Sequence, residues 1–445
     1  MKRRDFIKIS GAAALAAACA PKGSSLGSEA QEEAMEYRSN PNNGDRISLL
    51  GFGCMRWPMI KDANGKDIID QEAVNEMVDY AIAHGVNYFD TSPAYLQGQS
   101  EKAAGIALSR HPRESYYIAT KLSNFNDQTP EASIKMYKES FEQLKTDYFD
   151  YYLLHAIGRG GADAYNKRYV DNGLVPFLKE EKAAGRIRNL GFSFHGAQGE
   201  FDYFMQLHDS GEMVWDFCQI EMNYVDWKHA DGVFNVNADY LYAQLDQRNI
   251  PIIIMEPLLG GRLANVPEAI GKQMLQREPD KSIASWAFRF CGSYPRVLCI
   301  LSGMTSMDPL LDNINTFGHF KPLTAEELEF LEHMATQMKE YPLINCTNCK
   351  YCMPCPWGVD IPGTFQHYNK AITEGTYAQS QEQKDYRKLK KAYLVGYDRA
   401  VASIRQADHC ISCGICVSHC PQSIKIPREL KRIARYIEDL KQDRL

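Results

Sequence analysis

The chain has 445 residues, a formal net charge of −6, and 24% charged and 44% hydrophobic residues. This length accommodates two or three domains, each with a core of its own. Mixed charges with an acidic balance argue against a nucleic-acid partner. The lack of an apolar run of about eighteen residues argues against a membrane-spanning helix.

The first residues resemble a twin-arginine export signal. Paired arginines, Arg3 and Arg4, lie in the basic run Lys2–Lys8, which precedes a short and mildly apolar stretch, Ile9–Ala18. This order of segments is typical of exported proteins. An ordinary basic N-terminus is the alternative, because paired arginines are common. The signal predicts a periplasmic location, or a location tethered to the membrane outside the cytoplasm.

Cys19 follows Leu15–Ala18 in a pattern that resembles a lipoprotein processing site. The leucine stands one place too far upstream, so simple cleavage near the alanines is an equal alternative to lipidation. A lipid on Cys19 would anchor the protein to a membrane face. The Gly-, Ser-, Glu- and Asn-rich stretch Pro21–Asn43 predicts a flexible tether. We therefore assign residues 1–43 to the signal and the tether.

Between about Arg46 and Phe320, β-rich runs alternate with amphipathic helical patterns such as Glu72–His84 and Pro130–Lys145. The expected strands are Ile47–Cys54, Asn87–Thr91, Tyr116–Leu122, Tyr151–His155, Ile187–Ser193, Phe217–Met222, Ile250–Glu256 and Val297–Ser302. Eight strand-plus-helix units predict an α/β fold, a (β/α)8 barrel, over residues 44–322. A doubly wound open sheet would carry a GxGxxG turn after its first strand, and none is present.

Ionisable side chains stand at the ends of successive expected strands. Asp90 closes the second strand, Tyr95 lies in the loop after it, Lys121 closes the third strand and His155 closes the fourth. The carboxyl ends of barrel strands form the active face of this fold. Four such residues in register are hard to explain as packing, and they predict an active site.

In order, spacing and strand position these four residues match the catalytic tetrad of the aldo-keto reductases, which the chain resembles over residues 46–318. The resemblance implies that Tyr95 is the general acid, that Lys121 lowers its pKa, that Asp90 anchors Lys121, and that His155 positions the substrate. A free tyrosine is a poor acid near neutrality, so the ammonium is expected to favour ionisation of the phenol. The implied substrate is a small carbonyl compound or alcohol.

The same resemblance implies an extended NADP(H), or NAD(H), across the barrel mouth. The matching positions are Gly53, Cys54, Met55, Ser193, Gln219, Ser302, Gly303, Thr305, Asp312 and Asn313. Three features depart from the family: Phe194 follows Ser193, Met255 or Glu256 replaces the tyrosine that stacks on nicotinamide, and no Arg or Lys lies within residues 302–313 to meet a 2′-phosphate. An ordinary turn is the alternative interpretation of the stretch after Ser302.

Eight cysteines in the last hundred residues fall into two runs, each with closely spaced thiols and a final Cys-Pro. They are Cys346, Cys349, Cys352 and Cys355, then Cys410, Cys413, Cys416 and Cys420. This is the bacterial ferredoxin pattern for two [4Fe–4S] clusters. Zinc usually takes two separated CxxC pairs around one ion, and disulfides between such close cysteines would form strained rings.

In two-cluster ferredoxins the last cysteine of each run serves the other cluster. Cys420 is therefore expected to join the first run and Cys355 the second, although Cys355 departs from the usual spacing. More than fifty residues separate the runs, with helices expected over Thr364–Glu374 and Gln383–Arg405. A capping box at Thr324 begins a further helix. We assign residues 323–445 to a mostly α-helical, ferredoxin-like domain.

Together the patterns predict an exported oxidoreductase in which a carbonyl and an alcohol are interconverted by hydride transfer with NADP(H). Two [4Fe–4S] clusters would exchange electrons with an unknown redox partner. The twin-arginine route suits this composition, because clusters are inserted in the cytoplasm and that route carries folded cargo. The alternatives are an electron-transfer or docking protein with a catalytically silent barrel, and a reductase whose clusters are only structural.

Overall fold

The computed structural model of the protein describes residues 35–230 and 235–445. Eight parallel strands close into a barrel in the order β10-β11-β12-β3-β6-β7-β8-β9. Their bounds are β3 (Leu50–Gly53), β6 (Tyr88–Asp90), β7 (Tyr117–Leu122), β8 (Phe149–Ile157), β9 (Ile187–Phe194), β10 (Cys218–Glu221), β11 (Ile252–Met255) and β12 (Val297–Ser302). The predicted (β/α)8 barrel is confirmed. The twin-arginine motif and Cys19 lie outside the described residues.

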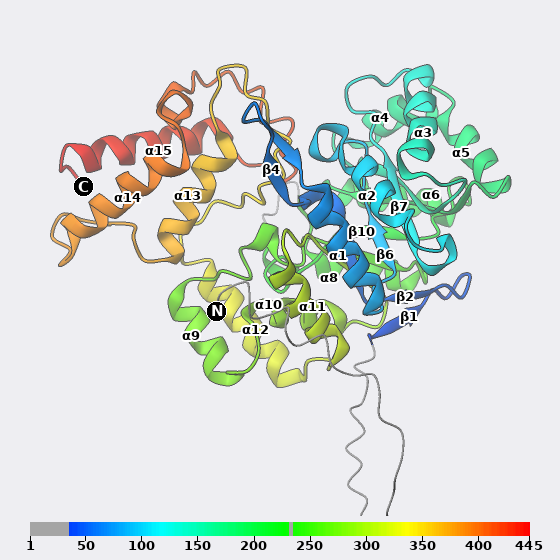
Figure 1. Cartoon of the computed structure of the whole chain (residues 1–445), viewed down its shortest axis with the longest axis horizontal. Helices are drawn as coiled ribbons and strands as arrows, with labels where there is room; N and C mark the ends of the chain where they lie inside the picture. The colour runs from blue at the N-terminus through cyan, green and yellow to red at the C-terminus, as the bar shows by residue number, and fades with distance from the viewer. Residues whose placement is uncertain (1–34, 231–234) are drawn as a thin grey trace, which may run out of the picture. The chain divides into compact units, whose positions relative to one another are not determined.

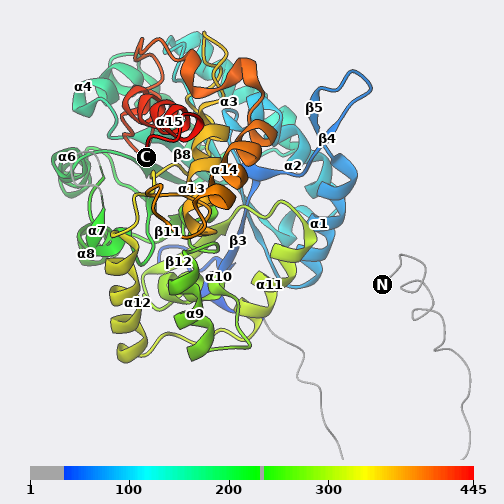
Figure 2. The ribbon, with the colours of Figure 1, turned by 90° about the vertical axis from the view of Figure 1, so that its left-hand side faces the viewer.

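Helices surround the barrel on its outside (Figures 1 and 2). They include α1 (Gln71–Ala83), α2 (Ser100–Leu108), α3 (Pro130–Leu144), α5 (Leu174–Ala183), α6 (Gln198–Asp209), α8 (Ala238–Gln247), α9 (Glu268–Arg277), α10 (Ile283–Gly292) and α11 (Met307–Gly318). Local sequence sets their ends. The Thr129 hydroxyl accepts from the Ala132 amide where α3 begins, and Lys145 ends that helix in a left-handed conformation.

The predicted tether is wrong for its last residues. β1 (Tyr37–Ser39) pairs antiparallel with β2 (Arg46–Ser48), so ordered structure begins before residue 44. Side chains hold β1 in place: the Tyr37 hydroxyl donates to the Gly85 carbonyl at 2.8 Å, and Arg38 donates to the Tyr294 carbonyl at 2.7 Å. The polar composition of this stretch concealed a strand whose partners lie far along the chain.

The apolar core of the barrel extends beyond the predicted boundary at residue 322. Helix α12 (Ala325–Met338) begins with the predicted capping box and buries Leu331, Met334 and Met338 in the barrel core. A separate apolar core begins at Ile344. It is built by α13 (Ile361–Thr373), α14 (Tyr386–Ala400) and α15 (Ile426–Lys441), which lie side by side in Figure 1. The structural boundary thus lies between residues 338 and 344.

Strand register brings the predicted residues to one edge of the barrel. Gly53 lies opposite Asp90, Gln219 lies opposite Ser193, and Lys121 lies opposite Leu153 on β8. All are at or near the carboxyl ends of their strands. The chain therefore gathers its polar side chains at the face where barrel enzymes carry their active sites. No helix in the described parts of the chain is long and apolar enough to cross a membrane.

Glu101 is a buried carboxyl on α2, outside the strands. Only 3% of the residue is exposed, and it accepts a 2.5 Å hydrogen bond from the Thr120 hydroxyl. Burial raises its pKa from an ordinary value of 4.5 to about 7. The folded protein therefore holds this proton more tightly than the unfolded chain does. The resulting stabilisation is complete below about pH 4.5 and is lost as the pH rises through about 7.

We expect Glu101→Gln to remove this pH dependence. At pH 8 the variant should be more stable than the wild type by up to about 3 kcal/mol, because no buried carboxyl has to ionise, and the gain should vanish near pH 4.5. Urea unfolding at several pH values measures the effect, with Glu114→Gln as a control at an exposed carboxyl. Equal pH dependence in wild type and Glu101→Gln would contradict the assignment.

Candidate functional site

A buried ion pair lies beneath the barrel mouth. Lys121 Nζ donates to Asp90 Oδ1 at 2.5 Å and to the Thr91 carbonyl at 2.9 Å, and both charged side chains are almost fully buried. Burial raises the pKa of Asp90 and lowers that of Lys121, while their contact opposes both shifts. Asp90 anchors Lys121, as predicted. Its second oxygen accepts from Gln219 Nε2 at 3.2 Å.

Tyr95 lies over this pair. Lys121 Nζ is 5.1 Å from the centroid of its ring, and the ring meets that of His155 edge-on at 5.9 Å. The predicted lowering of the pKa of Tyr95 is wrong. Burial, followed by the neighbouring Tyr351 and Asp90, raises the pKa of Tyr95 well above 10. The ammonium of Lys121 is compensated by Asp90, so the phenol keeps its proton and is suited to donate it.

His155 is held by hydroxyl groups below the mouth. Its Nδ1 lies 2.5 Å from Ser123 Oγ and 3.3 Å from Ser92 Oγ. Burial lowers its pKa well below 6.5, and the charges of Lys121 and Arg168 add to the effect. The imidazole is therefore neutral at physiological pH. A neutral ring beside a protonated phenol can orient a carbonyl oxygen through hydrogen bonds.

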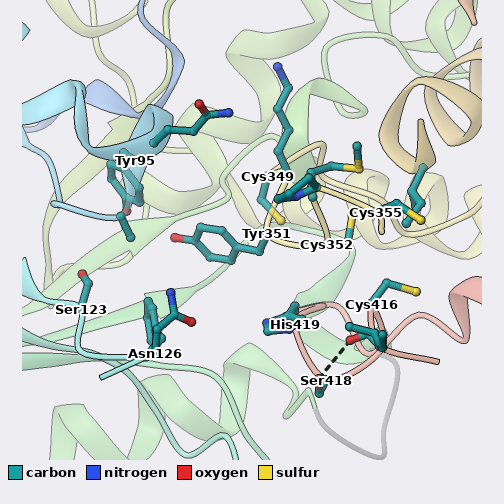
Figure 3. Close-up of a pocket in the computed structure, with 18 of the residues that line it drawn as sticks. Tyr95, Ser123, Asn126, Cys349, Tyr351, Cys352, Cys355, Cys416, Ser418 and His419 are labelled. Atoms are coloured by element: carbon teal, nitrogen blue, oxygen red, sulfur yellow. Dashed lines mark hydrogen bonds between the residues drawn. The ribbon is translucent and has the colours of Figure 1, made fainter. Parts of the chain in front are cut away.

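Tyr351 is a site residue that sequence reasoning missed. It stands between Cys349 and Cys352, and its side chain extends from this loop toward Tyr95 (Figure 3). Its hydroxyl lies 3.5 Å from His155 Nε2, a long hydrogen-bond distance. A tyrosine at a non-ligand position of a CxxC run carries no signal of its own. Only the fold shows that the cluster domain contributes a phenol to the barrel site.

The cysteines gather in the crossed groups that were expected. Cys346, Cys349, Cys352 and Cys420 line one small cavity. Burial and then the nearby thiols of Cys410, Cys355 and Cys413 raise the pKa of Cys416, which places Cys355 with the second run. Each group offers four thiols from two distant segments, which is the donor set of a [4Fe–4S] cluster. Among the described residues, no group of three or more Cys, His, Asp or Glu is placed to hold a single metal ion.

A cavity of about 1330 Å³ connects Tyr95 of the tetrad with the cysteines. Tyr95, Ser123 and Asn126 line it on the barrel side, and Tyr351, Cys352 and His419 line it on the cluster side. Figure 3 shows these residues around one space. The Arg159 guanidinium, which also lines this cavity, donates to the carbonyls of Ser418 and His419 and so joins the two sides. A substrate at Tyr95 would thus lie between the barrel and the cluster domain.

The predicted nucleotide positions do not form an open groove. Met55 and Thr305 line the cavity, whereas Cys54 is fully buried and its thiol donates to the Phe52 carbonyl at 3.6 Å. Gly53 lies against the Ser302 carbonyl, and Gly303 lies under the side chain of Arg56. The other polar residues of the predicted set form hydrogen bonds within the protein: Ser193, Gln219, Ser302, Asp312 and Asn313. The residues present therefore do not fit an extended dinucleotide, and we derive no step through one.

Comparison with known proteins agrees with the barrel and with the cysteines. A model of the aldo/keto reductase family matches residues 49–335. The chain belongs to the aldo/keto reductase family. A 4Fe-4S dicluster domain model matches residues 345–426, so this family member carries a ferredoxin-type domain after its barrel.

Curated relatives match about two thirds of this chain over nearly their whole length. L-galactose dehydrogenase of Arabidopsis thaliana is 32% identical over 314 residues, which cover 66% of this chain and 91% of that protein. The uncharacterized oxidoreductase YqkF of Bacillus subtilis is 26% identical, covering 65% of this chain and 94% of its own. These relatives are oxidoreductases, and this chain is a member of the same enzyme family.

Solved structures show the same fold. An aldo-keto reductase from Bacillus halodurans in its holo form superposes with a TM-score of 0.53 at 21% identity, covering 67% of this chain and 96% of that one. One from Klebsiella pneumoniae in complex with NADPH has a TM-score of 0.53 at 19% identity, covering 68% and 95%. At such identity these structures support the barrel architecture alone.

Proposed function

We propose that the protein is an exported oxidoreductase that interconverts a carbonyl compound and an alcohol at Tyr95, and that two [4Fe–4S] clusters exchange electrons with a redox partner. One observation carries this proposal: a protonated phenol and a neutral imidazole lie 5.9 Å apart, ring to ring, on a buried ion pair at the edge of a cavity that reaches the cysteines. Reduction of a carbonyl requires this kind of proton donor.

Each of the four tetrad residues has its own role in the reaction. Reduction of a carbonyl takes two electrons and two protons. The two clusters, once reduced by the partner, would supply the electrons, and solvent would supply the proton that ends on carbon. Tyr95 holds the other proton at its hydroxyl and gives it to the substrate oxygen as negative charge develops there. His155, neutral and fixed by Ser123, orients that oxygen. Lys121 places a positive charge beneath the ring, and Asp90 keeps the ammonium in position. In the alcohol-forming direction Tyr95 and His155 therefore act in the protonation states that their surroundings favour.

The eight cysteines would hold the two clusters in the crossed groups described above. Such clusters supply one-electron transfer when bound. NADP(H) is the hydride carrier that the family relationship indicates, and the Klebsiella structure contains NADPH. NADP(H) or NAD(H) use by this chain stays a prediction that the closed groove disfavours.

Export by the twin-arginine route, to the periplasm or to a membrane-tethered position through Cys19, belongs to the same proposal. The basic run with Arg3 and Arg4 supports it, as does the cluster domain, because clusters are inserted before export. Labelling with a radioactive fatty acid tests the lipid anchor. The mature chain should carry the label on a gel, and Cys19→Ala should not.

A docking or electron-transfer protein with a silent barrel is the second candidate. The filled groove favours it, since Thr347 of the cluster domain lies against Gly260 at the mouth. The two candidates are separated by assaying anaerobically purified protein against a panel of aldehydes, ketones and alcohols, with reduced or oxidised viologen dyes and with NADPH. We expect turnover with a one-electron dye. No turnover with any donor would favour the silent barrel.

A further inference from the structure

We infer that the segment Asn345–Tyr351 of the cluster domain occupies the place of the dinucleotide at the barrel mouth and excludes NADP(H) and NAD(H) while it is docked. The family lays its dinucleotide across the ends of the first, seventh and eighth barrel strands. In this chain those ends are β3, β11 and β12. Each of the three is engaged by the segment directly or through one side chain.

The loop after β11 carries the closest approach. Gly260 has a φ of +67°, and a Cβ added to it would lie 2.4 Å from the Cα of Thr347 and 2.6 Å from its carbonyl oxygen. Glu256 supports the loop by accepting from the Gly260 amide at 2.6 Å. Thr347 is itself buried at this contact, with 2% exposure. The loop and the segment are in direct contact here, so a phosphate cannot enter between Gly260 and Thr347.

Two arginines of the barrel hold the segment through hydrogen bonds. The guanidinium of Arg56, which follows β3, donates to the Thr347 carbonyl, while its aliphatic part covers Gly303 after β12. Arg262 Nη1 donates to Asn345 Oδ1 at 2.9 Å. Positive side chains near a dinucleotide groove would normally face its phosphates. Here Arg56 donates to a main-chain carbonyl of the cluster domain, and Arg262 donates to the side-chain amide of Asn345.

The side chains expected to hold a nicotinamide carboxamide are turned to other partners. Ser193 Oγ accepts from the Ala156 amide at 2.8 Å, and Gln219 donates to Asp90. The residues expected at the phosphate and adenine end are paired as well: Asn313 donates to Ser302 Oγ at 2.9 Å, and Ser282 donates to Asp312 at 2.7 Å. These polar groups are satisfied without a ligand.

The cluster domain also closes the centre of the mouth. Tyr351 reaches His155, and Gln422 donates to both carboxylate oxygens of Glu221 at 2.9 and 3.0 Å, at the end of β10. Gln422 of the cluster domain therefore covers the half-buried Glu221 at this edge of the mouth. The tetrad therefore faces the cysteine segment where relatives would present a nucleotide.

Equilibrium dialysis of the anaerobic, cluster-loaded full chain against NADPH and NADH tests the exclusion. We expect no saturable binding up to about 1 mM. Saturable binding in the micromolar range would overturn it. The dialysis measures binding and not catalysis. If the protein does not reduce carbonyl compounds, the exclusion of the dinucleotide can still hold. If the protein turns over with a dye, that result alone does not show that the dinucleotide is excluded.

A matched pair of glycine variants tests whether the segment causes the exclusion. Gly260→Ala and Gly261→Ala both place a side chain at positive φ, +67° and +95°, but only the first meets Thr347, since nothing lies within 4 Å of a Cβ at Gly261. We expect Gly260→Ala alone to speed amide exchange in residues 345–351 at least tenfold and to bind NADPH at least tenfold more tightly than Gly261→Ala. Faster amide exchange in residues 345–351 of Gly260→Ala without tighter NADPH binding would overturn the inference. If Gly260→Ala does not fold, the dialysis of the wild-type protein decides the question.

Discussion

Replacing Tyr95 with phenylalanine is expected to lower kcat for carbonyl reduction about 10²- to 10⁴-fold, the range over which a positioned proton donor contributes. The ring would keep its place over Lys121 and beside His155, so substrate binding and the iron content should change little. Steady-state kinetics with a viologen donor, combined with iron analysis of the same preparation, measures both quantities.

Tyr88→Phe is the matched control for this variant. Tyr88 lies on β6 close to Asp90, and its buried hydroxyl has no hydrogen-bond partner in the structure, so its removal should leave turnover unchanged. Because the pKa of Tyr95 lies well above 10, the rate should show no loss from ionisation of this phenol between pH 6 and 10. Full turnover in Tyr95→Phe would remove Tyr95 from the reaction.

The raised pKa of Tyr95 is a property that residue types alone do not predict. Lysine beside tyrosine suggested an acidified phenol, and the pairing of Lys121 with Tyr95 is present in the structure. The ammonium, however, is 2.5 Å from Asp90, and burial, followed by the neighbouring Tyr351, raises the pKa of the phenol. Burial and charge compensation depend on which side chains cover a site, and sequence spacing does not report that.

Strand positions were predictable because the barrel strands are short apolar runs between clear breaks. β12 has the predicted bounds, and β7 and β9 differ from them by one residue at one end. β1 was not predictable, since Tyr37–Ser39 is polar and is held by distant partners such as Gly85 and Tyr294. The end of helix α14 was not predictable either: the helix ends at Ala400, whereas a helix to Arg405 was expected. Contacts between residues far apart in the sequence determine the structure of such segments.

The cysteine groups could be predicted from spacing, whereas the covering of the barrel mouth could not. Close spacing within a run forces cysteines to face one site, and the crossed partners follow from the ferredoxin pattern. Nothing in the residues Cys346–Cys352 indicates that Thr347 packs on Gly260 or that Tyr351 reaches His155. Those contacts depend on how two separate cores meet, and this explains why the nucleotide prediction rested on resemblance alone.

Substituting Cys420 with serine is expected to halve the iron content, from about eight to about four atoms per chain, because one cluster loses a thiolate while the other keeps its four. Cys420 lines the cavity of Cys346, Cys349 and Cys352, so the lost cluster should be the one held by the first run. Its electron paramagnetic resonance spectrum after reduction should therefore match that of Cys346→Ser.

Cys413→Ser identifies the other cluster and completes the comparison. Under the crossed arrangement its spectrum must differ from that of Cys420→Ser, although the two cysteines are only seven positions apart. Cys291→Ala, a buried barrel cysteine whose thiol donates to the Met222 carbonyl, should keep the full iron content. If Cys420→Ser instead matched Cys413→Ser, each run would hold its own cluster. The loop bearing Tyr351 would then be fixed by a different set of four thiols, and the placement of that phenol at His155 would lose its support.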